Sequence, residues 1–343
     1  MRVNIIGGGL AGCALAYVLK NNGIEPVIYE ASSCLAAGAS GNDVGLYNPR
    51  LSAQFDGMAQ FYSAAFFQAL EVFEDFDGAI DWNPCGALTF LVDERKTIRF
   101  RKTAASWGWS DKDMRLVDAR SASDIAGVEV PYECLYLPRS GNISPKKLCY
   151  EYARGVEVHL NYVVDDLDAL DGDISVLACG AACLNFSVAS HLPLKYVRGQ
   201  VSYIAQTAVT QDLKVALSYG GHFAPARNGV HCLGATFQPW LDHSHLRDED
   251  DLSNLDKLFS AVPSLEGAYK VVDRRASVRT TARDHFPVVG QLSERVYIST
   301  AHGSYGILSS LLSAKLLSDC VVGDDKEGEC SMRAVLSPTR FKG

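Results

Sequence analysis

The sequence contains no apolar run of about 18 residues, the length that a membrane-spanning helix needs. Glycines break its first apolar stretch between Gly7 and Gly12, so the sequence predicts neither a membrane span nor a signal peptide. None of its ten cysteines is paired at metal-binding spacing, and the nearest two, Cys179 and Cys183, are separated by three residues instead of two. We therefore expect no metal, and reduced, mostly buried thiols in a cytoplasmic protein.

Excess positive charge is also missing, because the formal net charge is −8 at pH 7. This net charge argues against nonspecific nucleic-acid binding by a uniformly basic surface. The net charge does not exclude a local basic patch, because the segment from Glu94 to Lys102 carries five basic residues. This segment is either the solvated face of a helix or a contact for nucleic acid. The 343 residues, 48% of them hydrophobic, suffice for about two domains.

The chain begins with a strand-like run followed by three glycines at G-x-G-x-x-G spacing, Gly7, Gly9 and Gly12. In such a turn, the first glycine allows the tight bend, the second lets a pyrophosphate approach the backbone, and the third lets the helix pack against the sheet. A second strand then ends at Glu30, where a carboxylate can bind the ribose hydroxyls. The pattern predicts a dinucleotide site, against the alternative of a glycine-rich turn kept for packing.

Two later segments repeat this logic. A buried strand at 174–179 ends on Gly180, and the strand at 296–300 leads through Gly303 and Gly306 into an apolar helix from Ile307. The Ala, Ser and Gly-rich loop at 31–45 cannot fill a core, so we expect it to lie along the ligand.

The middle of the chain predicts a mixture of helices and short strands. Helical spacing of apolar residues indicates a buried helix within 55–76, Ser144 and Pro145 indicate a capped helix start, and short alternating runs at 198–237 indicate antiparallel strands. The acidic run 248–251 is expected to begin a helix on a solvated face. Residues after Cys320 are expected to form a poorly packed tail.

Several segments together resemble the D-amino-acid oxidase and glycine oxidase superfamily of FAD enzymes. They are the first glycine turn with Glu30, Arg198-Gly199-Gln200, Gly234-Ala235-Thr236, and Arg279-x-x-x-x-Asp284-x-x-Pro287-x-x-Gly290. Within the superfamily, the segments 38–42, 141–145 and 279–290 are most similar to the oxidoreductase half of the MnmC family, which acts on the tRNA wobble uridine.

The resemblance implies an α/β, two-domain fold, with a Rossmann-like FAD-binding domain and an antiparallel-sheet substrate domain. The implied boundaries are 1–50, 145–197 and 275–325 for the FAD-binding domain, 51–144 and 198–274 for the substrate domain, and 326–343 for the tail. FAD is expected to be non-covalent, because no cysteine falls within 275–287. The positions expected at the cofactor are Gly7, Gly9, Leu10, Ala11, Gly12, Glu30, Ala39, Ser40, Gly41, Asn42, Gly180, Gly303, Ser304, Tyr305, Gly306 and Ile307.

The implied reaction is oxidative removal of a carboxymethyl group, as glyoxylate, from 5-carboxymethylaminomethyl-uridine in tRNA, with molecular oxygen accepting the electrons. Arg279 matches the carboxylate-binding arginine of glycine oxidases, and the alternative is a structural ion pair with Asp284. His222 falls where related oxidases place a pocket tyrosine, although it equally fits an ordinary strand histidine, and Tyr47 is expected beside the flavin. The competing hypotheses are a small-molecule oxidase of glycine, sarcosine or D-amino acids, and a dinucleotide-binding protein that is not an oxidase.

Overall fold

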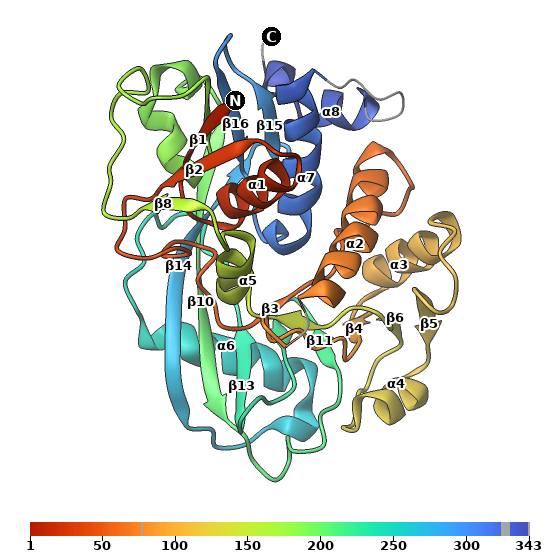
Figure 1. Ribbon diagram of the computed structural model, residues 1–343. Coiled ribbons are helices and arrows are strands. Elements are labelled where there is room, and N and C mark those ends of the chain that lie inside the picture. Colours follow the sequence, from red (N-terminus) through yellow and green to blue (C-terminus); the bar gives the residue numbers. More distant parts are fainter. Residues whose placement is uncertain (77, 324–329, 342–343) are drawn as a thin grey trace.

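The computed structural model describes residues 1–76, 78–323 and 330–341. Two large sheets organise the molecule, one in the upper and one in the lower half of Figure 1. The upper sheet is parallel except for β15, which runs antiparallel to β16. Its strands, in spatial order, are β15 (Val288–Gln291), β16 (Val296–Thr300), β9 (Ile174–Leu177), β1 (Arg2–Ile6), β2 (Glu25–Tyr29) and β8 (Glu157–His159).

The lower sheet is mostly antiparallel, with one parallel pair, β4 and β11. Its strands, in order, are β14 (Val271–Ala282), β10 (Leu194–Ala205), β13 (Val230–Gly234), β12 (His222–Phe223), β11 (Ala216–Ser218), β4 (Ala87–Phe90), β6 (Cys134–Leu137) and β5 (Arg115–Val117). A short two-stranded sheet pairs β3 (Gly45–Leu46) with β7 (Asn142–Ile143). The mixed α/β fold class predicted from the sequence is confirmed.

Helices cover both sheets (Figure 1). They are α1 (Leu10–Asn21), α2 (Gly57–Asp75), α3 (Glu94–Ser106), α4 (Ala119–Ala126), α5 (Pro145–Tyr152), α6 (Asp248–Ala261), α7 (Gly306–Val322) and α8 (Cys330–Leu336), with short 3₁₀ turns at 180–185, 187–189, 263–265 and 338–341. No helix among the described residues is long and apolar enough to cross a membrane.

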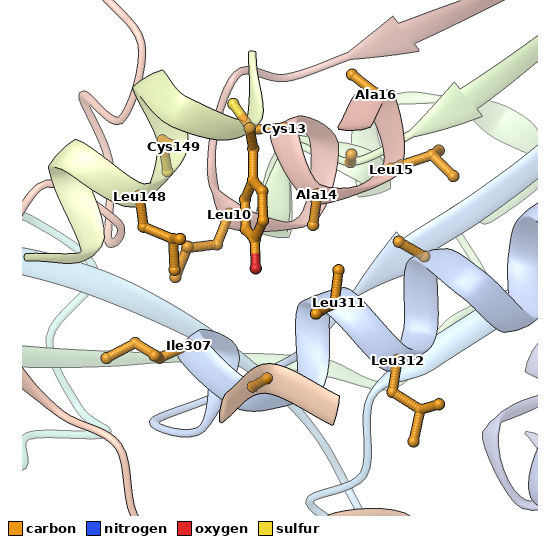
Figure 2. Close-up of a cluster of buried hydrophobic side chains, with 14 of the residues drawn as sticks. Leu10, Cys13, Ala14, Leu15, Ala16, Leu148, Cys149, Ile307, Leu311 and Leu312 are labelled. Atoms are coloured by element: carbon orange, nitrogen blue, oxygen red, sulfur yellow. The ribbon is translucent and has the colours of Figure 1, made fainter. Parts of the chain in front are cut away.

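The largest core lies where α1, α5 and α7 meet beneath the first glycine turn. Figure 2 shows side chains of these three helices pointing toward one another, among them Leu10, Leu148 and Leu311. The close packing requires Gly12, because a Cβ at this position would lie 2.0 Å from the carbonyl oxygen of Gly7. The sequence therefore places α1 against β1 through the absence of a side chain.

Two helix predictions are confirmed in detail. The apolar stripe within 55–76 is the buried face of α2, where Phe61, Phe66 and Phe73 are fully buried. Helix α5 begins at Pro145, and the Ser144 hydroxyl accepts a hydrogen bond from the Lys147 amide at 3.3 Å. Both follow from local rules, helical periodicity in one case and N-terminal capping in the other.

The implied domain boundaries do not coincide with linkers. The boundary at 197/198 lies inside β10 and the one at 274/275 inside β14, and these two strands pair from Leu194 to Ile204. Helix α2 also belongs by packing to the upper half, because Phe61 and Phe66 share one core with Ile5. Long paired strands and a shared core therefore connect the two halves.

The acidic start of α6 is not simply solvated, as the sequence had suggested. Asp250 and Asp251 are almost fully buried, whereas Asp248 and Glu249 are exposed. The Asp250 carboxylate pairs at 2.5 Å with Arg198, whose side chain is completely buried. A distant arginine on β10 thus provides the counter-charge, and such a partner is invisible to local sequence patterns.

The expected poorly packed tail is wrong for its described part. Residues 330–341 form α8 and a 3₁₀ turn, in which Leu336 is fully buried. Arg340 donates to the Asp284 carboxylate at 2.8 Å and to the carbonyl oxygen of Pro287 at 3.0 Å. The rest of the tail, 326–329 and 342–343, lies outside the described residues.

Candidate active site

A cavity of about 1090 Å³ lies between the two halves of the molecule. Its volume is at the upper end of the range for small-molecule and cofactor sites, about 300–1,000 Å³. The sequence-predicted residues that line it are Gly7, Gly9, Leu10, Ala11, Glu30, Ala39, Ser40, Asn42, Gly180, His222, Arg279, Gly303, Ser304, Tyr305, Gly306 and Ile307. The fold thus brings together segments from all along the chain.

Three predicted site residues do not line the cavity. Gly12 packs α1 against the first turn, and Gly41 packs its loop, since a Cβ there would lie 2.3 Å from the carbonyl oxygen of Ala36. Tyr47 is fully buried, accepts a hydrogen bond from the Trp82 indole at 3.0 Å and donates to the carbonyl oxygen of Arg139 at 3.3 Å. Burial also raises its pKa. The structure therefore gives Tyr47 a packing position outside the lining of the cavity.

The first glycine turn and Glu30 form one end of the cavity. The Glu30 carboxylate accepts hydrogen bonds from the Gly8 amide at 2.7 Å and the Ser32 amide at 2.8 Å. The Ser40 hydroxyl accepts from the Leu10 amide at 2.9 Å, which ties the following loop to the start of α1. Gly9 meets only Ser40 within 4 Å of its missing Cβ and otherwise faces open space, as a backbone cradle for phosphates requires.

The loop at 31–45 is held over this end by Arg275 of β14. Its guanidinium donates to the side-chain oxygen of Asn42 at 3.0 Å and to the carbonyl oxygen of Ala37 at 2.9 Å. This arginine therefore has a structural task, and the loop lies along the cavity through Ala39, Ser40 and Asn42, as expected from its composition.

Arg279, also on β14, points its guanidinium into the other part of the cavity. Nη2 donates to the carbonyl oxygen of Thr236 at 3.0 Å, while the buried Nε has no hydrogen-bond partner among the described residues. Gly199 on the neighbouring strand makes the room, because a Cβ there would lie 2.1 Å from Nη2. Among the described residues Arg279 forms no ion pair with Asp284, whose carboxylate pairs instead with Arg340.

Arg279 is partly exposed to the cavity and has no carboxylate partner among the described residues. Burial lowers its pKa from 12.5 to about 10, so it stays protonated at neutral pH. A buried charge is normally compensated by a counter-charge or by hydrogen bonds. The site is therefore suited to receive an anionic group from a ligand, and a planar guanidinium binds a carboxylate with two parallel hydrogen bonds.

His222 lines the same part of the cavity from β12. Burial, and then the nearby charge of Arg279, lower its pKa from 6.5 to about 4. Its Nε2 lies 3.7 Å from the Cys232 thiol. At neutral pH this side chain is therefore an uncharged imidazole that can donate or accept one hydrogen bond in the cavity.

His302 is a cavity residue that the sequence reasoning missed. It immediately precedes Gly303, and its ring nitrogens lie 2.8 Å from the Ser309 hydroxyl and 3.2 Å from the Ser299 hydroxyl. Burial lowers its pKa to about 4. Its position just before the second glycine turn was the available signal. Arg99, Thr89 and Cys179 also line the cavity without having been predicted there.

The two cavity histidines, whose pKa values are lowered by desolvation, predict a loss of stability in mild acid. Below about pH 6.5 the unfolded chain takes up protons that His222 and His302 of the folded protein do not take up until about pH 4. Stability is therefore complete above pH 6.5 and falls as the pH drops toward 4, by at most about 1.4 kcal/mol per pH unit for each ring. Urea unfolding at several pH values should give a shallower decline for His302→Asn than for the parent, and equal declines would contradict the assignment.

Within the described part of the chain, no group of three or more His, Cys, Asp or Glu side chains is arranged to hold a metal ion. No disulfide links the eight described cysteines between Cys13 and Cys232. Cys179 and Cys183 lie with their sulfurs 3.5 Å apart as free thiols.

Comparison with known proteins agrees with this geometry. This chain is 30% identical to the protein of Methylobacillus flagellatus that is named tRNA 5-methylaminomethyl-2-thiouridine biosynthesis bifunctional protein MnmC. The alignment covers 99% of this chain and 59% of that relative. The same values hold for the protein of that name in Pseudomonas fluorescens. The chain thus spans about three fifths of the length of these curated relatives.

Solved structures share the fold. Glycine oxidase from Geobacillus kaustophilus has a TM-score of 0.83 at 20% identity, over 99% of both chains. L-proline dehydrogenase from P. horikoshii has a TM-score of 0.82 at 14% identity, over 99% of this chain and 97% of that one. The model of the family described as FAD dependent oxidoreductase, DAO, matches residues 2–320. With the family match over nearly its whole length and a cavity lined by both glycine turns, the chain belongs to the DAO family of FAD-dependent oxidoreductases.

Proposed function

We propose that this protein oxidises the carboxymethylaminomethyl side chain of a tRNA wobble uridine, releases the carboxymethyl group as glyoxylate and leaves the aminomethyl form. The observation that carries the proposal is the unpaired guanidinium of Arg279 in the cavity. The substrate end is chemically a glycine whose nitrogen carries the nucleoside, so it brings the carboxylate that this guanidinium lacks. The names of the relatives supply the tRNA context.

The residues at the other end of the cavity fit FAD. The first glycine turn and the amino end of α1 would hold the pyrophosphate, Glu30 would hold the ribose, and the turn at 303–307 would face the flavin. FAD, when bound, supplies the acceptor for the hydride of the substrate C–H bond. We expect it to be bound non-covalently.

The chain's own contribution to the chemistry is mainly positioning. Arg279 fixes the carboxylate and, through its contact with Thr236, keeps one orientation. Neutral His222 lines the same space without adding a second positive charge. Loss of two electrons and two protons converts the C–N bond to an imine, and addition of water then releases glyoxylate and the amine. Molecular oxygen, taking up both electrons and protons, would become hydrogen peroxide.

The basic patch predicted between Glu94 and Lys102 lies on α3 and would bind RNA phosphates. Arg99 of this helix lines the cavity, so the patch adjoins the site. Arg101 pairs with Glu133 at 2.7 Å, whereas no ion pair involves Arg95, Lys96 or Lys102 among the described residues. In this proposal the protein works on tRNA in the cytoplasm, where its thiols stay reduced.

Anaerobic flavin reduction tests the function. An RNA stem-loop carrying 5-carboxymethylaminomethyl-uridine at micromolar concentration should bleach the flavin absorbance in a single turnover, and the same RNA with unmodified uridine should not. Free glycine and sarcosine at millimolar concentration should react far more slowly, because they lack the nucleoside part of the substrate. Rapid bleaching by glycine or sarcosine with none by the modified RNA would contradict the proposal and favour the small-molecule oxidase.

A further inference from the structure

Two aromatic side chains stand exposed on the segment that connects β13 with α6. Phe237 is 56% exposed and Trp240 is 73% exposed, the highest value among the large hydrophobic side chains of the described residues. Phe237 also lines the cavity and directly follows Thr236, whose carbonyl oxygen accepts the hydrogen bond of Arg279. Phe237 thus lies at the part of the cavity assigned to the substrate, and Trp240 follows three residues later on the same segment.

The segment is held rigidly from beneath by a buried arginine. The backbones of Arg198 and Gln238 exchange hydrogen bonds of 2.9 and 3.1 Å. The buried Arg198 guanidinium also donates to the side chain of Gln238, to the carbonyl oxygen of His245 and to the Asp250 carboxylate. Gln238 in turn donates to Asp250 at 2.7 Å. The buried Arg198 therefore anchors the segment at two points, Gln238 and His245. Gln238 lies in sequence between the two exposed aromatic residues, Phe237 and Trp240.

Such anchoring matters because rigid, exposed rings lose little conformational freedom when a ligand stacks on them. The core of the fold does not need either ring, since the groups that hold the segment are Gln238 and the backbone. Asp242 lines the cavity from the same segment, and its carboxylate repels phosphates while it can accept hydrogen bonds from the edge of a base. The two rings and the Asp242 carboxylate are therefore suited to contact the bases of an RNA, and not its phosphate backbone.

The charge for an RNA backbone lies elsewhere around the same cavity, on α3. Its exposed residues Arg95 and Lys102, with cavity-lining Arg99, form a basic strip. A polynucleotide spanning the cavity would meet cations on one side and aromatic faces on the other, as single-stranded nucleic-acid sites do.

We propose that Phe237 and Trp240 form a stacking platform for unpaired bases that flank the target nucleotide of a single-stranded RNA loop. This inference rests on the proposed function and adds how the substrate is selected. A duplex keeps its bases stacked inside the helix, so the platform favours a loop over a paired strand.

The test measures the affinity for an RNA stem-loop and for a fully paired duplex of the same length over a range of salt concentrations. Stacking is worth about 1–3 kcal/mol per base, so Phe237→Ala and Trp240→Ala should each weaken stem-loop binding by about 5- to 150-fold. Neither should change the slope of log K against log salt. Trp240→Phe, which keeps an aromatic face, should bind within about threefold of the parent.

Two comparison variants separate stacking from charge and from general surface effects. Combined replacement of Arg95, Lys96 and Lys102 by Ala should reduce the salt slope, by about 0.7 for each lost phosphate contact on a single strand. Tyr150→Ala removes an aromatic side chain that is 44% exposed on α5 and does not line the cavity, so it should leave binding unchanged. Flavin content and melting temperature show whether each variant is folded. If Phe237→Ala loses flavin, Trp240→Ala decides the result, because Trp240 does not line the cavity.

The platform would be overturned if Trp240→Ala bound the stem-loop within twofold of the parent affinity. It would also be overturned if Tyr150→Ala lost as much stem-loop affinity as Trp240→Ala, or if Trp240→Ala changed the salt slope. If the parent protein is still reduced by modified RNA in that case, the proposed function stands and only the platform fails. If the parent neither binds RNA nor is reduced by it, both fail.

Discussion

Arg279→Ala is expected to slow flavin reduction by the modified RNA by roughly 30-fold to several-thousand-fold. Removing one partner of a desolvated charge pair costs about 2–5 kcal/mol, and each 1.4 kcal/mol is about tenfold in rate. The partly exposed guanidinium lines the cavity, donates a hydrogen bond to the carbonyl oxygen of Thr236, and has an Nε without a partner within the described chain. Arg279→Lys should lose much of the rate too, because an ammonium cannot reproduce the two-point contact.

The measurement is single-turnover flavin reduction under anaerobic conditions. Arg283→Ala is the matched control, because this arginine lies four residues away, is exposed and does not line the cavity. It should react at the parent rate, and both variants should retain FAD. A rate for Arg279→Ala within about threefold of the parent would make Arg279 a structural residue and remove the main support of the proposed function. Arg275 is unsuitable as a control because it holds the loop over the cavity.

Gly9→Val is expected to yield a colourless protein without FAD. The backbone of Gly9 is extended, with φ −89° and ψ −172°, so a side chain is not excluded by backbone strain. Its Cβ would lie 3.1 Å from the Ser40 hydroxyl, which accepts the hydrogen bond of the Leu10 amide. The two further methyl groups of valine must displace Ser40 or occupy the cavity where the pyrophosphate approaches. Either outcome removes the phosphate cradle.

The ratio of flavin to protein absorbance of the purified protein measures this effect. Gly267→Val serves as the control, since a Cβ there meets only Tyr269, at 3.9 Å, and the residue does not line the cavity. Gly9→Ala should fall between the parent and Gly9→Val, because one methyl group requires only a small shift of Ser40. Full occupancy in Gly9→Val would show that the cofactor does not approach this turn.

Local sequence patterns were reliable where the physical reason for a structure lies within the same short segment. The spacing of Gly7, Gly9 and Gly12 predicted the strand, turn and helix, because only a residue without a side chain fits beside the carbonyl oxygen of Gly7. Helical periodicity predicted α2, and Ser144 with Pro145 predicted the start of α5. Each of these signals acts within a few residues of chain, so the rest of the fold does not alter it.

Predictions that depended on a distant partner were less reliable. The acids of α6 looked solvated, but Arg198, on β10, buries Asp250 through an ion pair. The tail looked loose, but Arg340 is bonded to Asp284 and Leu336 is buried. Tyr47 was expected beside the flavin, but its hydroxyl turns toward Trp82. In each case the deciding contact joins residues far apart in sequence.

The sequence by itself determined the dinucleotide turn, the alternation of strands and helices, and the residue types from which a carboxylate site can be built. Only the tertiary structure decided that Arg279 lies at the cavity without a counter-ion, while Arg275 supports a loop and Arg283 stays exposed. The three arginines lie within nine positions of chain, and only the spacing of Arg279 to Asp284, Pro287 and Gly290 in the family motif distinguished it from the other two. Arg275 and Arg279 lie on β14, beside the loop at 31–45 and beside Thr236 respectively, whereas Arg283 follows the end of the strand and is exposed. Their burial and charge compensation are therefore set by segments that are distant in sequence.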